Sequence, residues 1–536
     1  MPGVVPPAQG RQRRPGAVGG VAPQAARAGA VAAPRGHGGQ PRDTAAGGAV
    51  RAADGAAGGP DPQEGTAPRE EPPFRVGQEI DVAIEDVAQG GWCVARPEGL
   101  PVMFVRHALP GERVTARVTE VTSKFARADA VRVNQASPDR VTAPCPSAHP
   151  GGCGGCDWQH ASLPAQRALK AAVVEQQLRR VAGLDRTVTV EPLAGDGTAA
   201  DIAGTDDMPE TDAIETDAIE ARPAARPPGL GWRTRVQFAV DTQGVAGLRA
   251  HRSHRVVDVG DCLIAHQGIR DLGVTAENWS GATGVEVASG GLDAAENYAV
   301  TVVEDAAAGR ASGPRPGAKG QPRGRSRGNP RGGRAARPRR TLAAGRAFLA
   351  EQAGGRLWQV SADGFWQVHP AAAGRLSQAV IEALDPAPGD TVLDLYCGAG
   401  LFAGVLAPLV GQDGAVTGIE SDPAAVRNGR QNLADFPWAG LREADVADAA
   451  GDPELASCRL VVADPPRAGL ARAVIDYLTG DSQAERFAYV SCDPATLARD
   501  LALLIAGGWR LDQLRAFDAF PMTHHVECVA TLIRLR

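Results

Sequence analysis

The sequence TVLDLYCGAG, at residues 391–400, places a hydrophobic strand directly before a glycine-rich turn. Three further strand-like stretches follow it: AVTGIE, RLVVAD and FAYVSC. Helical segments such as PAAVRNGRQNLADF and PATLARDLALLIAGG separate them. Strands that alternate with helices in this way form a mostly parallel sheet with helices on both faces. Residues 371–536 are therefore predicted to form a Rossmann-like, doubly wound α/β domain.

Acidic residues stand where these predicted strands end. Ligands of such sheets bind beyond the carboxyl ends of the strands. The first strand runs through Asp394 into a turn at Gly398, where glycine allows a ligand to approach the backbone. Glu420 ends the next strand and can accept hydrogen bonds from both hydroxyls of a ribose. Asp445 is placed to meet an adenine amino group, and Asp464 closes a fourth strand.

Each acid alone could be a helix cap or a solvated turn residue. Four of them in phase favour a nucleoside-containing cofactor. The turn is neither GxGxxG nor GxxxxGK[ST], so the pattern supports neither a dinucleotide fingerprint nor a P-loop. The constellation resembles the class I S-adenosylmethionine methyltransferases.

A thiol and a carboxyl group come at two further strand boundaries of the same domain. Cys492 follows the strand FAYVS and precedes a helix, whose N-terminus is expected to lower the pKa of the thiol. Glu527 lies 35 residues later, in HHVE, just before the last strand. A buried structural cysteine is the alternative. The position at a strand end, over the predicted cofactor site, favours a nucleophile and a base.

Methylation of uracil at C5 requires both groups. The C5 carbon is a weak nucleophile until a thiolate adds to C6. After methyl transfer a general base must remove the C5 proton before the thiol can leave. Methylation of an exocyclic amine needs neither group, and it uses an Asp/Asn-Pro-Pro followed by an aromatic ring. Here Arg467 follows Asp464-Pro-Pro instead.

The motifs DLYCGAG, DPPRAG, SCDPATLARDL and HHVE are similar to those of the bacterial RNA uracil-C5 methyltransferases, which form 5-methyluridine. The upstream stretch GFWQVHP, at residues 364–370, resembles the family's Phe-x-Gln-Val segment. The resemblance implies that Phe365 stacks on an extruded uracil and that Gln367 contacts the cofactor. It also implies that Tyr396 lines the site together with Glu420 and Asp464, and it adds Asp445 with less support.

Four cysteines form a separate group, with Cys145, Cys153 and Cys156 in a C-x7-C-x2-C pattern and Cys262 far downstream. Four thiolates suit either zinc or an iron–sulfur cluster, and the spacing does not choose between them. The ribosomal RNA branch of the family resembles this pattern and carries a [4Fe-4S] cluster. The resemblance therefore implies an iron–sulfur cluster and ribosomal RNA as the substrate.

The rest of the chain divides by composition. Alternating hydrophobic residues between Gly/Pro turns predict a small β-barrel, which resembles a TRAM RNA-binding domain. Segments rich in Gly, Pro, Ala and charge cannot bury enough surface to fold. The predicted order is a disordered tail (1–73), the barrel (74–138), a central α+β domain (139–370) with an acidic insertion (196–228) and a basic insertion (306–340), and the methyltransferase domain (371–536).

Charge and composition limit the possible functions. The net charge of −6 over 536 residues gives no general sign of a nucleic-acid partner, but Arg310–Arg340 holds eleven basic residues and no acidic one. That segment either contacts RNA phosphates or is an inert linker. The sequence has no apolar run long enough to span a membrane and no secretory signal, and nine cysteines in so long a chain are no disulfide scaffold.

We therefore expect a cytoplasmic, monomeric RNA uridine-C5 methyltransferase that uses S-adenosylmethionine. A tRNA uridine-C5 methyltransferase is an alternative, as is an enzyme acting on cytosine C5 or on an exocyclic amine. An inactive RNA-binding or ribosome assembly factor is the alternative from another class.

Overall fold

The structure is a computed structural model, and it describes residues 73–193, 228–291, 296–305 and 338–535. Three predicted disordered segments fall almost wholly outside these ranges. They are the N-terminal tail, the acidic insertion and the basic insertion, of which only residues 73, 228 and 338–340 are described.

The N-terminal barrel domain is a six-stranded sheet in the order β1-β5-β6-β4-β3-β2. Only β4 and β6 pair in parallel; the other neighbours are antiparallel. Alternate residues of its strands point into one hydrophobic core, as the period of two in the sequence predicts. The strands are β1 (Glu79–Ala83), β2 (Asp86–Ala88), β3 (Trp92–Ala95), β4 (Val102–Arg106), β5 (Arg113–Val121) and β6 (Phe125–Gln135).

The central region contains a second, wholly antiparallel sheet in the order β10-β9-β8-β11-β12-β13. A two-stranded hairpin, β14 and β15, follows it in the chain. The elements are β8 (Arg235–Val240), β9 (Ala246–Arg249), β10 (Val256–Val257), α2 (Gln267–Arg270), β11 (Gly284–Ser289), β12 (Tyr298–Glu304), β13 (Arg339–Gly345), β14 (Phe348–Ala353) and β15 (Arg356–Ser361). The basic insertion thus ends in a strand, where Arg340 pairs with Glu286.

The C-terminal domain is built on an eight-stranded sheet in the order β18-β17-β16-β19-β20-β22-β21-β7. Five strands run parallel, and β22 is antiparallel to both neighbours. The predicted doubly wound sheet is confirmed. Its strands are β16 (Thr391–Leu395), β17 (Ala415–Glu420), β18 (Ala439–Glu443), β19 (Leu460–Ala463), β20 (Arg486–Ser491), β21 (Trp509–Asp518), β22 (Glu527–Arg534) and β7 (Val190–Pro192).

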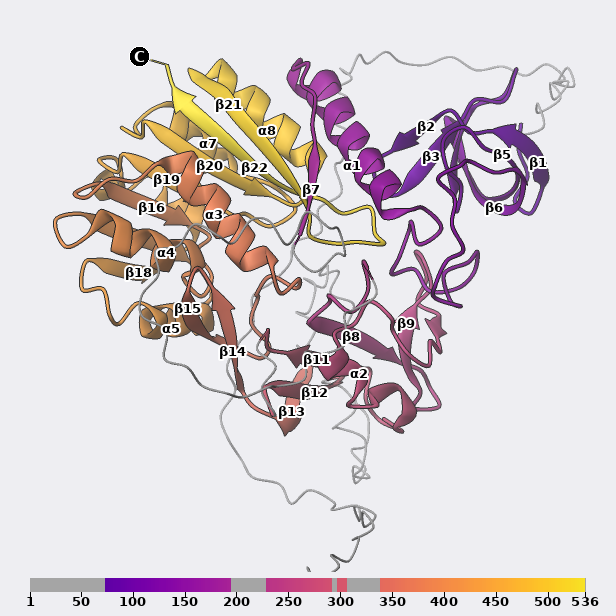
Figure 1. The fold of residues 1–536 in the computed structure, drawn as a ribbon, viewed down its shortest axis with the longest axis horizontal. Coiled ribbons are helices and arrows are strands. Elements are labelled where there is room, and N and C mark those ends of the chain that lie inside the picture. The colour runs from indigo at the N-terminus through magenta and orange to yellow at the C-terminus, as the bar shows by residue number, and fades with distance from the viewer. Residues whose placement is uncertain (1–72, 194–227, 292–295, 306–337, 536) are drawn as a thin grey trace, which may run out of the picture. The chain divides into compact units, whose positions relative to one another are not determined.

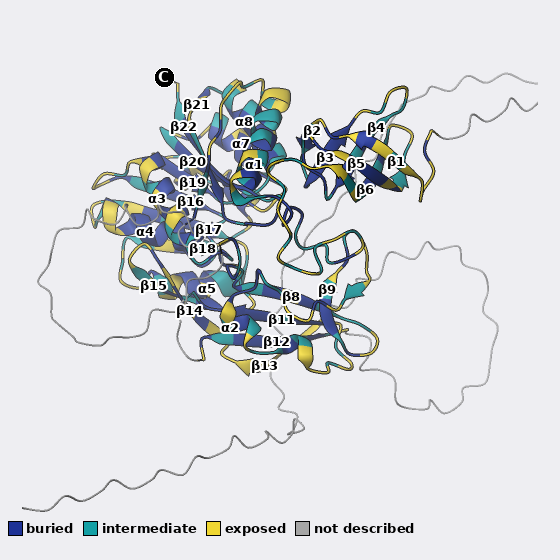
Figure 2. Ribbon diagram, turned by 45° about the vertical axis from the view of Figure 1, so that its right-hand side comes forward, coloured by how far each residue is buried: buried dark blue, intermediate teal, exposed yellow. Residues whose placement is uncertain are grey.

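Helices cover both faces of this sheet, as Figure 1 shows. One hydrophobic core lies under α3, α4 and α5, and another lies under α1, α6, α7 and α8. Because both faces are covered, β19 and β20 are almost entirely buried (Figure 2). The helices are α1 (Leu163–Gln177), α3 (Ala372–Leu384), α4 (Leu401–Val410), α5 (Pro423–Asn432), α6 (Val446–Ala449), α7 (Arg472–Thr479) and α8 (Pro494–Ala506).

Helix α1 and strand β7 come from the stretch that the sequence assigns to the central domain. The structure instead packs α1 beside α8, and β7 pairs in parallel with β21 at the edge of the methyltransferase sheet. Hydrophobic residues such as Val174, Leu178 and Val190 join the core of that sheet, which explains the placement. None of the helices in the described ranges is both long and apolar enough to cross a membrane.

Candidate active site

The glycine-rich turn after β16 has the tight geometry that its sequence predicts. Gly398 and Gly400 have φ values of +54° and +86°, in the region that favours glycine. Tyr396 has a φ of +63°, which is uncommon for a residue with a side chain. Strained backbone of this kind is concentrated at functional sites. Gly400 is the N-cap of α4. The backbone of the turn therefore lies between the end of β16 and the start of this helix, at the edge of the sheet where a ligand is expected.

Glu420, at the end of β17, lies against this turn. Its Oε2 atom accepts a hydrogen bond from the Gly398 N–H at 3.1 Å, and its Oε1 atom accepts one from the Asp422 N–H at 2.7 Å. Oε1 also accepts a hydrogen bond from Ser421 Oγ at 3.3 Å, which leaves Oε2 with a second lone pair for a ribose hydroxyl. The position and the donors thus suit the predicted contact with a ribose.

Asp394 is fully buried beneath the turn. Its Oδ2 atom accepts a hydrogen bond from the Ala403 N–H at 2.8 Å, whereas its Oδ1 atom has no hydrogen-bond partner among the described residues. Burial, with smaller contributions from the nearby Asp464 and Glu420, raises the pKa of this carboxyl group to about 8. An unpaired buried oxygen under a ligand-binding turn is an acceptor left for a ligand or a water.

Three further predicted site residues differ in how far they are exposed to solvent. Asp445 is exposed and caps α6, with its Oδ1 atom accepting a hydrogen bond from the Ala447 N–H at 2.9 Å. In this structure Asp445 therefore acts as a helix cap, which is the alternative role that the sequence allowed. Phe365 is 72% exposed, which is unusual for so large an apolar side chain. Gln367, two residues on, is buried, and its Nε2 atom lies 3.4 Å from Asp464 Oδ2.

The antiparallel register of β20 and β22 brings Cys492 and Glu527 together. Ser491 pairs with Cys528 in this register, so Cys492 comes opposite Glu527 at the end of the sheet. Asp464 follows β19, which is the other neighbour of β20. One thiol and two carboxyl groups therefore meet at adjacent strand ends.

The sequence-based prediction that a helix N-terminus lowers the pKa of Cys492 is wrong in direction. Burial first, and then the charges of Glu527 and Asp464, together raise the pKa of this thiol to about 12. The N-terminus of α8 is already occupied, because Asp493 accepts hydrogen bonds from the N–H groups of Ala495 and Thr496. A proton must therefore leave Cys492 before it can act as a nucleophile.

The two carboxyl groups are also shifted toward their neutral forms. Desolvation raises the pKa of Asp464 to about 7, and burial together with Asp464 holds the pKa of Glu527 well above its usual range. Arg467 acts in the opposite direction on both Cys492 and Glu527, whose pKa values it lowers. A carboxylate with a raised pKa is a stronger base once it is ionised.

Cys492 opens into a pocket of about 520 Å³ that is shared with the barrel domain. Gln89 in the β2–β3 turn donates a hydrogen bond from Nε2 to Asp493 Oδ2 at 2.9 Å. The sequence did not predict that the barrel lies next to the Cys492 thiol. The lining residues are Ala88, Gln89, Gly90, Gly91, Val173, Arg467, Cys492, Asp493, Pro494, His524 and His525.

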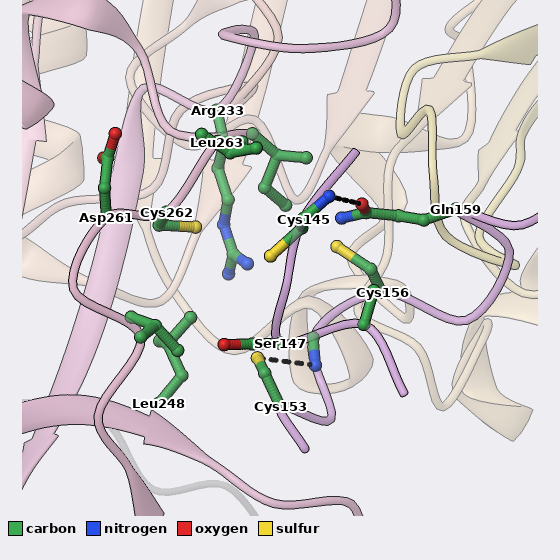
Figure 3. A pocket seen from close by; sticks show the side chains of 14 residues that line it. Cys145, Ser147, Cys153, Cys156, Gln159, Arg233, Leu248, Asp261, Cys262 and Leu263 are labelled. Carbon is green, nitrogen blue, oxygen red and sulfur yellow. Dashed lines mark hydrogen bonds between the residues drawn. The ribbon is translucent and has the colours of Figure 1, made fainter. Parts of the chain in front are cut away.

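The four cysteines of the predicted metal site line a different pocket, of about 390 Å³ (Figure 3). Burial raises the pKa of Cys153, Cys156 and Cys262, and neighbouring thiols of the group raise each of them further. Arg233 also lines this pocket. Within the described ranges, no three His, Cys, Asp or Glu side chains lie close enough together to hold one metal ion.

Comparisons with known proteins identify the same regions. The family model described as tRNA (Uracil-5-)-methyltransferase matches residues 452–535, and the TRAM domain model matches residues 73–131. A third model, described as protein-L-isoaspartate(D-aspartate) O-methyltransferase, matches residues 368–452. These matches fall on the methyltransferase sheet and on the barrel domain.

This chain matches curated relatives over almost the whole length of those relatives. A protein of Streptomyces avermitilis, named an uncharacterized RNA methyltransferase, is 45% identical over 462 residues, which is 85% of this chain and 98% of the relative. A similarly named protein of Streptomyces coelicolor is 45% identical over 470 residues, which is 87% of this chain and 95% of the relative.

Among solved structures, the tRNA (uracil-54, C5)-methyltransferase of Pyrococcus abyssi, in complex with S-adenosyl-L-homocysteine, matches with a TM-score of 0.56 and 22% identity. The match covers 85% of this chain and all of that one. The fold is that of an S-adenosylmethionine-dependent methyltransferase. The chain belongs to the RNA uracil-C5 methyltransferase family and carries an N-terminal TRAM domain.

Proposed function

We propose that this enzyme methylates C5 of a uridine in ribosomal RNA through a covalent bond between Cys492 and C6 of the base. The observation that carries this proposal is that the register of β20 and β22 brings Cys492 opposite Glu527 at the end of the sheet, where Cys492 lines a pocket. An exocyclic amine or a hydroxyl would need neither a nucleophile nor a base at this position.

S-adenosylmethionine supplies an electrophilic methyl group. The glycine turn, Glu420 on the ribose and the unpaired Oδ1 atom of Asp394 form a fitting cradle at the ends of β16 and β17. We assign Gln367, Tyr396 and Asp464 to the same cradle, and Asp445 to its adenine end. Phe365 is exposed and can stack on a base that has left its helix.

Cys492 acts first in the proposed sequence. Its thiolate forms a bond to C6, and the electron pair of the C5–C6 double bond moves into the uracil ring as an enolate. C5 then takes the methyl group, and the bond between that methyl and its sulfonium sulfur breaks. Glu527 removes the C5 proton, the double bond forms again, and Cys492 leaves as a thiolate. The base is released as 5-methyluracil, still part of the RNA chain.

We further propose that Cys145, Cys153, Cys156 and Cys262 hold a [4Fe-4S] cluster. All four thiols line one pocket, and four thiolates are the ligands that either an iron–sulfur cluster or zinc would take there. The choice of the cluster rests on the resemblance of the cysteine pattern to that of the ribosomal RNA branch of the family. Zinc remains the alternative.

Ribosomal RNA is favoured over tRNA by the cysteine group, since the resemblance connects it with the ribosomal RNA branch. All nine cysteines are free thiols, which suits a reducing cytoplasm. The matching Pyrococcus abyssi protein is named a tRNA (uracil-54, C5)-methyltransferase, so the test must distinguish the two RNAs.

The test is the 5-methyluridine content of purified ribosomal RNA and tRNA from cells with and without the gene, measured by nucleoside mass spectrometry. We expect 5-methyluridine to disappear from one position or more of ribosomal RNA. A loss from tRNA alone would contradict the substrate. No loss, combined with methyl incorporation at a cytosine or an amine, would contradict the reaction.

A further inference from the structure

The loop of residues 519–526, between β21 and β22, leads directly into Glu527; we call it the catalytic loop. Met522 in this loop has a φ of +69°, a strained value for a residue with a side chain. Buried polar groups from residues 157–170 hold it. Gln166 Oε1 accepts a hydrogen bond from the Met522 N–H at 2.7 Å, and Lys170 Nζ donates one to the Phe520 carbonyl at 3.0 Å.

Asp157 is the member of this group that also contacts the barrel domain. Its Oδ2 atom accepts a hydrogen bond from His524 Nδ1 at 2.5 Å. Its Oδ1 atom lies 3.2 Å from Arg106 Nη2, on β4 of the barrel, and both side chains are about 95% buried. A Cβ atom added at Gly91, in the β2–β3 turn, would lie 2.8 Å from Asp157 Cβ. The barrel turn and the catalytic loop therefore meet on this one carboxylate.

The contacts continue from His524 to the catalytic pocket. The rings of His524 and His525 have centroids 4.0 Å apart, and Arg467 Nη2 donates to His525 Nε2 at 3.3 Å. Arg467 lines the pocket together with Cys492. A continuous path thus runs from Asp157 by a hydrogen bond to His524, by ring contact to His525, and by a second hydrogen bond to the cation beside the thiol.

We propose that Asp157 is a positioning residue for the methyl transfer: it holds His524 and His525 so that Arg467 stays beside Cys492 and Glu527. The role in methyl transfer rests on the proposed function. Arg467 is a cation that favours the ionised forms of both groups, against the effect of burial. If the histidines move, this cation moves with them, although Asp157 touches neither the substrate nor the thiol.

The first test compares Asp157→Asn with Glu112→Gln in the full-length protein. Glu112 is a fully buried carboxylate of the barrel that pairs with Arg140, just after the barrel in the chain, so it controls for the loss of a buried charge away from the pocket. We expect Asp157→Asn to lower kcat by about 10-fold or more, with KM changed less than about threefold, as fits a lost interaction of about 1.4 kcal/mol. Equal loss of kcat in both variants, in proportion to their melting temperatures, would overturn the proposal.

The second test is independent of the RNA substrate. Iodoacetamide alkylation of Cys492, followed by peptide mass spectrometry, reports the thiolate fraction at pH 8. We expect Asp157→Asn and Arg467→Gln each to slow alkylation of Cys492 by roughly the same factor, about 3–10-fold for up to one pKa unit. The double variant should be no slower than the slower single variant, because both changes remove the same effect.

Separate, multiplying effects of the two changes would show that Asp157 does not act through Arg467. An unchanged alkylation rate in Asp157→Asn would contradict the positioning role outright. If alkylation responds as expected but the wild-type enzyme forms no 5-methyluridine, the proposed function fails and the positioning of Cys492 stands.

Discussion

The catalytic pair and the cysteine pocket differ in what holds their residues. Cys492 and Glu527 sit at the ends of β20 and β22, where the register of one sheet fixes which residues are neighbours. The four pocket cysteines lie outside the helices and the named strands, although Cys153 forms a single bridge with Ala250. Regular strands make neighbours that a sequence pattern can predict, whereas loops bring residues together only through the complete tertiary structure.

The comparison predicts that substitutions in the Cys492–Glu527 pair and in the cysteine pocket have different effects. Loss of a strand-end residue should remove chemistry and leave the fold intact. Loss of a pocket cysteine should first reduce binding of the proposed metal group and, with it, the stability of the loops that surround the pocket.

The largest expected effect is on the nucleophile. Cys492→Ala should reduce methyl transfer by more than about 10⁴-fold, because loss of a covalent nucleophile disables the whole catalytic unit. The melting temperature should stay within about 2 °C of the wild type, since the side chain lies at a pocket wall. Methyl incorporation with purified ribosomal RNA and thermal melting measure the two quantities. Retained turnover would remove Cys492 from the mechanism.

The acidity of the strand-end carboxyl groups predicts a pH dependence. Asp464 has its pKa raised to about 7, and Glu527 is raised as well, so both are largely neutral in mildly acidic solution. A base must be ionised, and therefore kcat/KM should rise with pH, by about tenfold per unit up to neutrality. The thiol, with its pKa raised to about 12, changes the rate in the same direction. A profile that falls between pH 6 and pH 8 would contradict these assignments.

The exposed ring of Phe365 tests the substrate end of the site. Phe365→Ala should raise KM for RNA by about 5- to 150-fold, since stacking of a base on an aromatic ring is worth about 1–3 kcal/mol. Phe365→Tyr is the matched control and should keep most of the affinity. Phe348 is also exposed and lies on the β14–β15 hairpin, so Phe348→Ala controls for a general loss of exposed apolar surface. Equal effects at Phe365 and Phe348 would contradict stacking.

The cysteine pocket should respond mainly in stability and iron content. Cys156→Ser should remove the broad absorbance near 400 nm and lower the melting temperature by several degrees, because binding of a metal group contributes to folding. Cys458→Ser makes the same chemical change at a buried thiol outside the pocket, and it should keep the iron. If the wild-type protein contains stoichiometric zinc and no iron, the iron–sulfur assignment is wrong and the site is a zinc site.

The sequence predicted those parts of the fold that depend on hydrophobic periodicity and on which residues end each strand. The strand before Gly398, the acid that ends β17 and the positions of Cys492 and Glu527 at strand boundaries all follow from the alternation of strands and helices in a doubly wound sheet. The doubly wound sheet is confirmed by the structure and the family by the comparisons, while the roles of the individual site residues stay predictions.

The failures have physical causes that no local pattern contains. The direction of the Cys492 pKa depends on burial and on two carboxyl groups from other strands, which outweigh a nearby helix N-terminus that Asp493 already caps. The placement of α1 and β7 on the methyltransferase sheet depends on which hydrophobic face is open to them. The positioning role proposed for Asp157 could not be predicted from the local sequence CGGCDWQ, because its partners, Arg106 and His524, lie 51 and 367 residues away.

The central claim is a covalent intermediate from which Glu527 releases the enzyme. Its most direct test is to incubate Glu527→Gln with S-adenosylmethionine and the RNA substrate, and then to separate the mixture under denaturing conditions. Because the C5 proton cannot be removed, the account predicts a protein–RNA adduct that survives denaturation and disappears when Cys492 is also changed to Ala. Near-normal turnover by Glu527→Gln, with no adduct, would contradict it.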